Sequence, residues 1–225
     1  MSEPGTGGKV LLIDLGGGSC EITLSEHKRI KDTISLPLGA VRLTEEFLQV
    51  DPASPEDLAR MRRLIARELR RAHRRIQPGK VQLVIATSGT AAALAEACGA
   101  VLAKSGKEMK SLRKSLRDGG TGFAPTPLVR KLAAKLSRMS LPEREAVQGI
   151  GPRRAEIITA GAQVFAELLE SYNLAGFRYS PLGLRDGILA QMLAAQDQRA
   201  AIHRQFEIER WESVVATAER YGVDM

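Results

Sequence analysis

The chain has 225 residues, of which 44% are hydrophobic and 26% are charged, and its formal net charge is +7 at pH 7. This composition excludes a disordered chain, and no apolar run approaches the roughly 18 residues that a membrane span requires. We therefore expect a folded cytoplasmic protein. Two cysteines are too few for a disulfide framework, so Cys20 and Cys98 are interpreted as reduced packing residues. The excess positive charge indicates a polyanionic partner such as nucleic acid, an anionic membrane or a phosphate polymer.

Three strands are expected at the start of the chain, over residues 10–14, 20–25 and 30–36, because apolar or alternating runs are separated there by turn-forming residues. This arrangement predicts an antiparallel meander. A long helix follows the capping residues Ser54, Pro55 and Asp57, and it should run to about Gln77.

The long helix is amphipathic and basic. Apolar residues recur at helical spacing on one face, and arginines fall on the other: Arg60, Arg63, Arg67, Arg70 and Arg74. The simpler interpretation is a solvated face, and the alternative is a face that contacts a ligand.

The rest of the chain reads as two strands and several helices. A buried strand, "VQLVIATSGT", leads into a helix over 91–104, and a basic, glycine-rich linker or insertion spans 104–127. Helices are expected over 128–140 and 153–172, then a strand over 177–180 and a final helix from Leu184. This order describes one α/β domain with a mixed sheet.

The stretch "DLGGGS" raises the possibility of a phosphate-binding turn. Dinucleotide and P-loop turns require a helix directly after the glycines, but a strand, "CEITLSE", follows here. The pattern therefore favours a hairpin whose tip offers backbone N–H groups to an anion. Asp14 would then hold a divalent metal, and Glu21 shares its strand face with Ser19. The alternative is a tight hairpin that binds no ligand.

Two further turns are suited to phosphate. Ser88, Gly89 and Thr90 lie between the apolar strand and a helix, which supplies a helix N-terminus and hydroxyl groups. Arg185 and Asp186 lie near the start of the final helix, where the arginine either binds phosphate or pairs with the aspartate. Together the turns suggest a site for a polyphosphorylated ligand.

Five motifs, in order and spacing, resemble the second domain of the exopolyphosphatase and guanosine pentaphosphate phosphohydrolase family, within the actin, sugar-kinase and heat-shock ATPase superfamily. They are "DLGGGSCEI", "ISLPLGAVRLTEEFL", "SGTAAALAEA", "PRRAEIITAG" and "PLGLRDGIL". The resemblance implies a ribonuclease H-like (actin-like ATPase) domain, dependence on Mg²⁺, and hydrolysis of a terminal phosphoanhydride. The implied substrate is inorganic polyphosphate or guanosine pentaphosphate, with no membrane partner.

The resemblance also assigns roles by motif. Asp14 would organise the metal, and Glu21 would lie in the active site with metal or water. Phosphate would be held by Gly16, Gly17, Gly18, Ser19, Ser88, Gly89, Thr90 and Arg185. Cys20 departs from the family pattern, which usually has threonine there, but its neighbours match.

The family resemblance also sets expectations for domain organisation. Residues 1–9 would be a disordered leader or remnant, 10–200 the second ribonuclease H-like domain, and 201–225 the truncated start of a helical domain. The first domain, with the glutamate usually assigned as catalytic base, would precede Val10. We therefore expect that domain as a partner and little activity from this chain alone, and a homodimer is compatible with the sequence.

Two alternatives belong to other functional classes. The stretch "VQGIGPRRAEII", with Arg153 and Arg154, is similar to a helix-hairpin-helix element of a non-specific nucleic-acid-binding module. An ATP-using kinase or chaperone of the same superfamily would share the two glycine turns but not "PLGAVRLTEEFL" or "GLRDGIL".

Overall fold

A computed structural model describes residues 8–27, 29–104 and 122–182, and the fold is given for these residues. The expected leader falls almost wholly outside them. So do most of the expected linker, the final helix from Leu184 with Arg185, and residues 201–225.

A six-stranded mixed sheet organises the domain, with the strand order β3-β2-β1-β4-β6-β5. Strand β1 pairs antiparallel with β2 and β2 with β3, so the expected meander is confirmed. Strand β4 runs parallel to β1 and to β6, and β5 closes the other edge antiparallel to β6. The strands are β1 (Lys9–Leu15), β2 (Cys20–Glu26), β3 (Arg29–Leu36), β4 (Leu83–Thr87), β5 (Phe123–Pro125) and β6 (Gly176–Tyr179).

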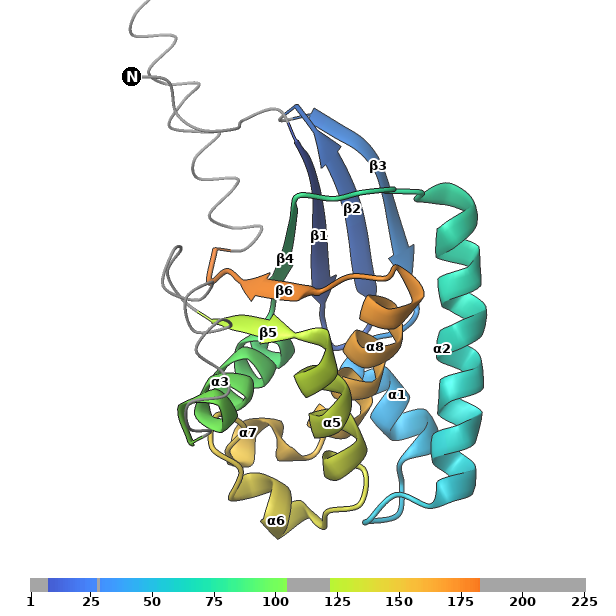
Figure 1. Ribbon diagram of the computed structural model, residues 1–225. Helices are drawn as coiled ribbons and strands as arrows, with labels where there is room; N and C mark the ends of the chain where they lie inside the picture. The colour runs from blue at the N-terminus through green and yellow to red at the C-terminus, as the bar shows by residue number, and fades with distance from the viewer. Residues whose placement is uncertain (1–7, 28, 105–121, 183–225) are drawn as a thin grey trace, which may run out of the picture. The chain divides into compact units, whose positions relative to one another are not determined.

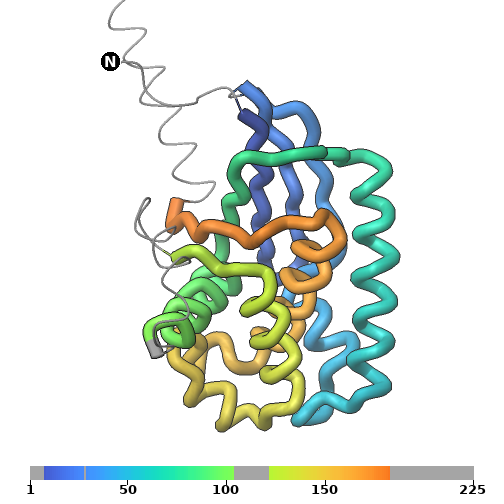
Figure 2. Tube along the Cα trace, viewed as in Figure 1, coloured from blue at the N-terminus to red at the C-terminus, as the bar shows by residue number. Residues whose placement is uncertain are grey.

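The helices pack around α8, which is buried along almost its whole length and contacts α1, α2, α3, α5 and α7. Figure 1 shows α8 in the middle of this group and α2 along the outer side of the domain, and Figure 2 shows the chain passing from β3 through α1 into α2 and back to β4. The helices are α1 (Ala40–Phe47), α2 (Pro55–Arg75), α3 (Gly89–Lys104), α5 (Thr126–Leu136), α6 (Leu141–Glu145), α7 (Pro152–Ala155) and α8 (Ile158–Ser171).

The core side of the sheet is set by strand alternation. Leu11, Ile13 and Leu15 of β1 are at most 2% exposed, whereas the residues between them are half-buried.

Cys20 and Cys98 are both free and buried, as expected. Burial raises the pKa of the Cys98 thiol to about 12. Burial also raises the pKa of Cys20, and the nearby Glu21 and Asp14 carboxylates add to that effect. Both thiols therefore remain protonated packing groups.

Helix α2 begins as the capping pattern predicts. Ser54 accepts a hydrogen bond from the Asp57 backbone N–H, and Pro55 occupies the first turn. The helix ends at Arg75, two residues before the expected end. The five arginines expected on the outer face are all exposed.

Four local expectations need correction. The helix expected over 153–172 is two helices, because the buried Arg144 Nε donates to the Ala155 carbonyl at 2.8 Å, an oxygen that a continuous helix would use in its own ladder. Strand β5 lies inside the expected linker, where it is held by pairing with β6. Helices α1 and α6 were not expected as elements.

No helix in the described part of the chain is both long enough and apolar enough to cross a membrane.

Candidate active site

Two sequence-predicted turns lie side by side at one edge of the sheet. Strands β1 and β4 are parallel neighbours, and Asp14 is in register with Thr87. The glycine turn that follows β1 and the Ser88 turn that follows β4 therefore leave the sheet at adjacent positions. Strand β6 ends at the same edge, where the Ser180 N–H donates to the Ala86 carbonyl at 2.9 Å.

A row of polar residues crosses the sheet next to these turns. Glu21 is directly opposite Asp14, and Ser35 of β3 is directly opposite Glu21. Directly paired residues share one face of a sheet, so Ser35, Glu21, Asp14 and Thr87 form a row on the face opposite Leu15. The Ser35 hydroxyl donates to Glu21 Oε1 at 2.6 Å. Ser35 was missed in the sequence because only the strand register shows that it meets Glu21.

Helix α1 is hydrogen-bonded to the glycine turn. The Ala40 N–H donates to the Gly16 carbonyl at 3.0 Å, and the Arg42 N–H donates to the Gly17 carbonyl at 3.1 Å. Within the turn, the Gly16 N–H donates to the Ser19 carbonyl at 2.9 Å. The carbonyl groups of Gly16, Gly17 and Ser19 thus accept hydrogen bonds within the domain.

Several N–H groups of the glycine turn have no hydrogen-bond partner in the described structure. Among the described residues, the backbone N–H groups of Gly17, Gly18 and Ser19 have no acceptor. Gly17 and Gly18 are exposed, and a Cβ atom added to Gly18 would meet nothing within 4 Å. The expected hairpin is confirmed by the β1–β2 pairing, and anion binding by its N–H groups stays a prediction.

The second turn combines a strained residue with a helix start. Ser88 has a φ of 94°, a backbone conformation that few residues other than glycine adopt. Its carbonyl accepts from the Ala92 N–H at 3.1 Å. The N–H groups of Gly89 and Thr90 lie in the first turn of α3 and have no acceptors in the described structure. Thr90 itself is 2% exposed, and its side chain packs against Gly161 of α8. Only the backbone of Thr90 is therefore placed to contact a ligand.

The Arg154 side chain lies against the second turn, although the sequence pattern indicates this arginine only as a nucleic-acid contact. A Cβ atom on Gly89 would lie 1.8 Å from Arg154 Nη2, so the guanidinium lies directly on the start of α3. No acidic partner of Arg154 occurs among the described residues. A guanidinium beside free helix N-terminal N–H groups is an arrangement that favours phosphate.

The packing of the Gly149–Gly151 hairpin argues against the nucleic-acid alternative. Gly149 has a φ of 91°, and a Cβ atom there would lie 2.8 Å from the Ala97 backbone nitrogen. The hairpin is therefore pressed against α3, and Arg154 points to Gly89 within the same domain.

The residues at this edge fit a magnesium ion better than a zinc ion. Mg²⁺ is usually held by one or two carboxylates, with waters and substrate phosphates as the other ligands, and Asp14 and Glu21 supply that number. Within 8–27, 29–104 and 122–182 there is no group of three or more His, Cys, Asp or Glu residues that could hold a metal. The described residues therefore offer no closed cage of the zinc type.

Comparison with models of protein families shows to which family the chain belongs. The model of the Ppx/GppA phosphatase family matches residues 2–196. The chain belongs to the Ppx/GppA phosphatase family. The resemblance stated from the five sequence motifs is thereby confirmed.

Members of the Ppx/GppA family with related sequences carry exopolyphosphatase names. The chain is 32% identical over 196 residues to exopolyphosphatase 1 of Mycobacterium leprae, which covers 87% of this chain and 55% of that protein. It is 29% identical over 162 residues to exopolyphosphatase 2 of Mycobacterium tuberculosis, over 72% of this chain and 47% of the relative. The chain spans about half the length of these relatives.

Solved Ppx/GppA structures share the fold. The Aquifex aeolicus family member aligns with a TM-score of 0.68 at 25% identity, over 84% of this chain and 57% of that one. The expected actin-like, ribonuclease H-like fold with its antiparallel start is therefore confirmed.

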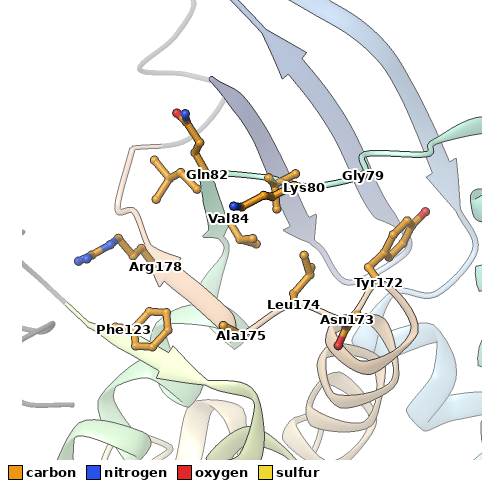
Figure 3. A pocket seen from close by; sticks show the side chains of 13 residues that line it. Gly79, Lys80, Gln82, Val84, Phe123, Tyr172, Asn173, Leu174, Ala175 and Arg178 are labelled. Atoms are coloured by element: carbon orange, nitrogen blue, oxygen red, sulfur yellow. The ribbon is translucent and has the colours of Figure 1, made fainter. Parts of the chain in front are cut away.

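A cavity of about 550 Å³ lies apart from the Ppx/GppA motif residues (Figure 3). It is lined by the chain that enters β4, from Gly79 to Val84, and by the connection from α8 to β6, with Tyr172 and Arg178. None of the predicted site residues lines it. The candidate site is therefore assigned to the sheet edge with the two turns.

Proposed function

We propose that the chain supplies the metal- and phosphate-binding part of a phosphoanhydride hydrolase of the exopolyphosphatase type. The reaction would release terminal phosphate from inorganic polyphosphate or guanosine pentaphosphate by attack of water. One observation carries this proposal: the paired carboxylates Asp14 and Glu21 lie in register beside two turns with free N–H groups. Carboxylates, amide donors and an arginine are the groups that phosphoryl transfer requires.

Each group has a separate role in the proposal. Asp14 holds Mg²⁺, which when bound neutralises charge on the phosphoryl oxygens. Glu21 orients water or a metal ligand, and Ser35 fixes its carboxylate through the 2.6 Å hydrogen bond. The N–H groups of Gly17 and Gly18 bind one phosphate region. Those of Gly89 and Thr90, with the Arg154 guanidinium, bind another.

The proposal is tested by titrating the chain with long-chain polyphosphate in a calorimeter, with Mg²⁺ or with EDTA, at two salt concentrations. We expect Mg²⁺ to strengthen binding at both. Because the resemblance places the catalytic base on another domain, phosphate release by this chain alone should be far slower than by intact exopolyphosphatases. Binding that ignores Mg²⁺ would contradict the proposal, and release at intact-enzyme rates would contradict the need for another domain.

Arg154→Gln should weaken Mg²⁺-dependent polyphosphate binding by about tenfold, because a charge-assisted bond to phosphate is lost. Gly89→Ala should have a similar effect, since its methyl group would displace the Arg154 side chain. Because both changes act on one contact, the double variant should lose less binding free energy than the sum of the two single losses. Arg153→Gln is the matched control, since Arg153 is an exposed neighbour of equal charge. An equal loss in Arg153→Gln would show that only net charge matters.

Ser35→Ala should weaken Mg²⁺-dependent binding about fivefold by freeing the Glu21 carboxylate, and Ser35→Thr should restore most of it. The matched control is Thr33→Ala. Thr33 Oγ1 lies 2.8 Å from Thr23 Oγ1, so this change also removes a hydroxyl contact between β2 and β3. Calorimetry with and without Mg²⁺ measures the effect. If both alanine variants lose the same affinity, Ser35 only supports the sheet.

A further inference from the structure

The arginines of α2 divide into those that the fold uses and those that it does not. The helix contains eight arginines. Arg62 Nε donates to Gln163 Oε1 at 2.9 Å, and Arg75 Nε lies 2.8 Å from Asp32 Oδ1. Arg60 pairs with Asp57, while Arg67 and Arg71 both pair with the largely buried Glu68. Five of the eight therefore have partners within the domain.

The other three lie on one line. Arg63, Arg70 and Arg74 are exposed, and no hydrogen bond or ion pair joins them to any described residue. At 100° per residue they fall within a narrow sector opposite the core-facing Met61, Ile65 and Ala72, each 0% exposed. The three arginines span about 16 Å along the helix axis, at 1.5 Å per residue. We call them the arginine row.

Helix α2 is a rigid support for the arginine row. Its opposite face is built into the core, and Figure 1 and Figure 2 show its full length at the outer side of the domain. The N-terminal cap at Ser54 and the Arg75–Asp32 ion pair hold the two ends. A line of cations on a fixed backbone suits a linear polyanion that is longer than one or two phosphates.

We propose that the arginine row binds an inorganic polyphosphate chain, at a surface separate from the glycine-turn site. This inference rests on the proposed function and narrows its substrate to long-chain polyphosphate. The row contains no residue of the Asp14 and Glu21 site. It therefore binds a part of the polyphosphate chain that lies away from the reacting end. Arginine suits this role because its guanidinium matches phosphate oxygens with two donors.

The composition of α2 favours polyphosphate over single-stranded nucleic acid. Surfaces for single strands combine cations with aromatic side chains on which bases stack. Residues 55–75 contain no Phe, Tyr or Trp, and the ring of the single histidine, His73, packs against Tyr172 in a tilted arrangement, at 4.0 Å between ring centroids. The row thus offers contacts to phosphate alone.

The test compares Arg63→Gln/Arg70→Gln/Arg74→Gln with a control that removes three charges elsewhere. The control is Lys131→Gln/Lys135→Gln/Arg138→Gln, which changes exposed residues of α5 and the turn after it. Binding of long-chain polyphosphate is measured in EDTA over a salt series, so that metal-dependent binding is excluded. We expect at least a tenfold loss at about 50 mM salt in the row variant, and a salt slope smaller by about three. The control should stay within about twofold.

Two further ligands sharpen the result. Tripolyphosphate is too short to span the row, so its affinity should be the same in both variants. Row-variant binding equal to wild type would overturn the proposal. The proposal would also be overturned if double-stranded DNA of matched charge bound the wild type as tightly as polyphosphate does and lost the same affinity in the row variant. The Mg²⁺-dependent binding that tests the proposed function is measured separately, so either proposal can fail while the other stands.

Discussion

The Asp14→Asn/Glu21→Gln double variant is expected to lose the Mg²⁺-dependent part of polyphosphate binding. The two carboxylates are directly opposite each other in the β1–β2 ladder, and they are the acidic pair beside both phosphate turns. Amides of the same shape remove the charge that attracts Mg²⁺ but keep the packing. We expect the Mg²⁺-dependent affinity to fall at least about a hundredfold, equivalent to about 2.7 kcal/mol.

Stability separates this loss from unfolding. Like charges that face each other across strands destabilise a sheet, so the double variant should be as stable as the wild type or slightly more stable. Binding in EDTA should be equal or stronger, because two negative charges are gone. Glu45→Gln/Glu46→Gln, two exposed carboxylates of α1, is the matched control for net charge. Calorimetry and urea unfolding provide the measurements, and Mg²⁺-dependent binding that survives in the double variant would refute the assigned site.

Gly39→Ala is expected to be the most destabilising single substitution considered for this domain. Gly39 is buried at the start of α1, and a Cβ atom there would lie 2.1 Å from the Gly17 carbonyl oxygen and 2.2 Å from the Gly18 carbonyl carbon. These are backbone atoms of the glycine turn, so the turn and α1 would have to separate. The free energy of unfolding should fall by about 3 kcal/mol or more.

Gly18→Ala is the matched substitution on the other side of the same contact. Its added methyl group meets no atom within 4 Å, and its φ lies outside the left-handed region. Stability should change by less than about 1 kcal/mol. The methyl group would, however, add bulk to the exposed turn beside the Gly18 N–H group, so Mg²⁺-dependent polyphosphate binding should weaken. Urea unfolding and calorimetry of both variants test the pair, and a stable Gly39→Ala or a fully binding Gly18→Ala would contradict this division of roles.

The sequence by itself determined the features that depend on neighbouring residues. An apolar run predicted β1, alternation predicted β2 and β3, and the Ser54 cap predicted the start of α2. The strand after "DLGGGS" argued against a P-loop and indicated a hairpin, which the β1–β2 pairing confirms. These signals are local because strand faces, caps and turns are set by residues within a few positions of one another.

Only the tertiary structure decided how distant segments meet. The register placed Ser35 against Glu21 and Asp14 beside Thr87, and the packing of α7 placed Arg154 on Gly89. The Arg144 bond to the Ala155 carbonyl divided a segment whose pattern reads as one helix. Strand β5 exists through its pairing with β6, since three residues carry almost no strand signal of their own. Each of these features depends on contacts between residues far apart in the chain, and periodicity within one segment does not encode such contacts.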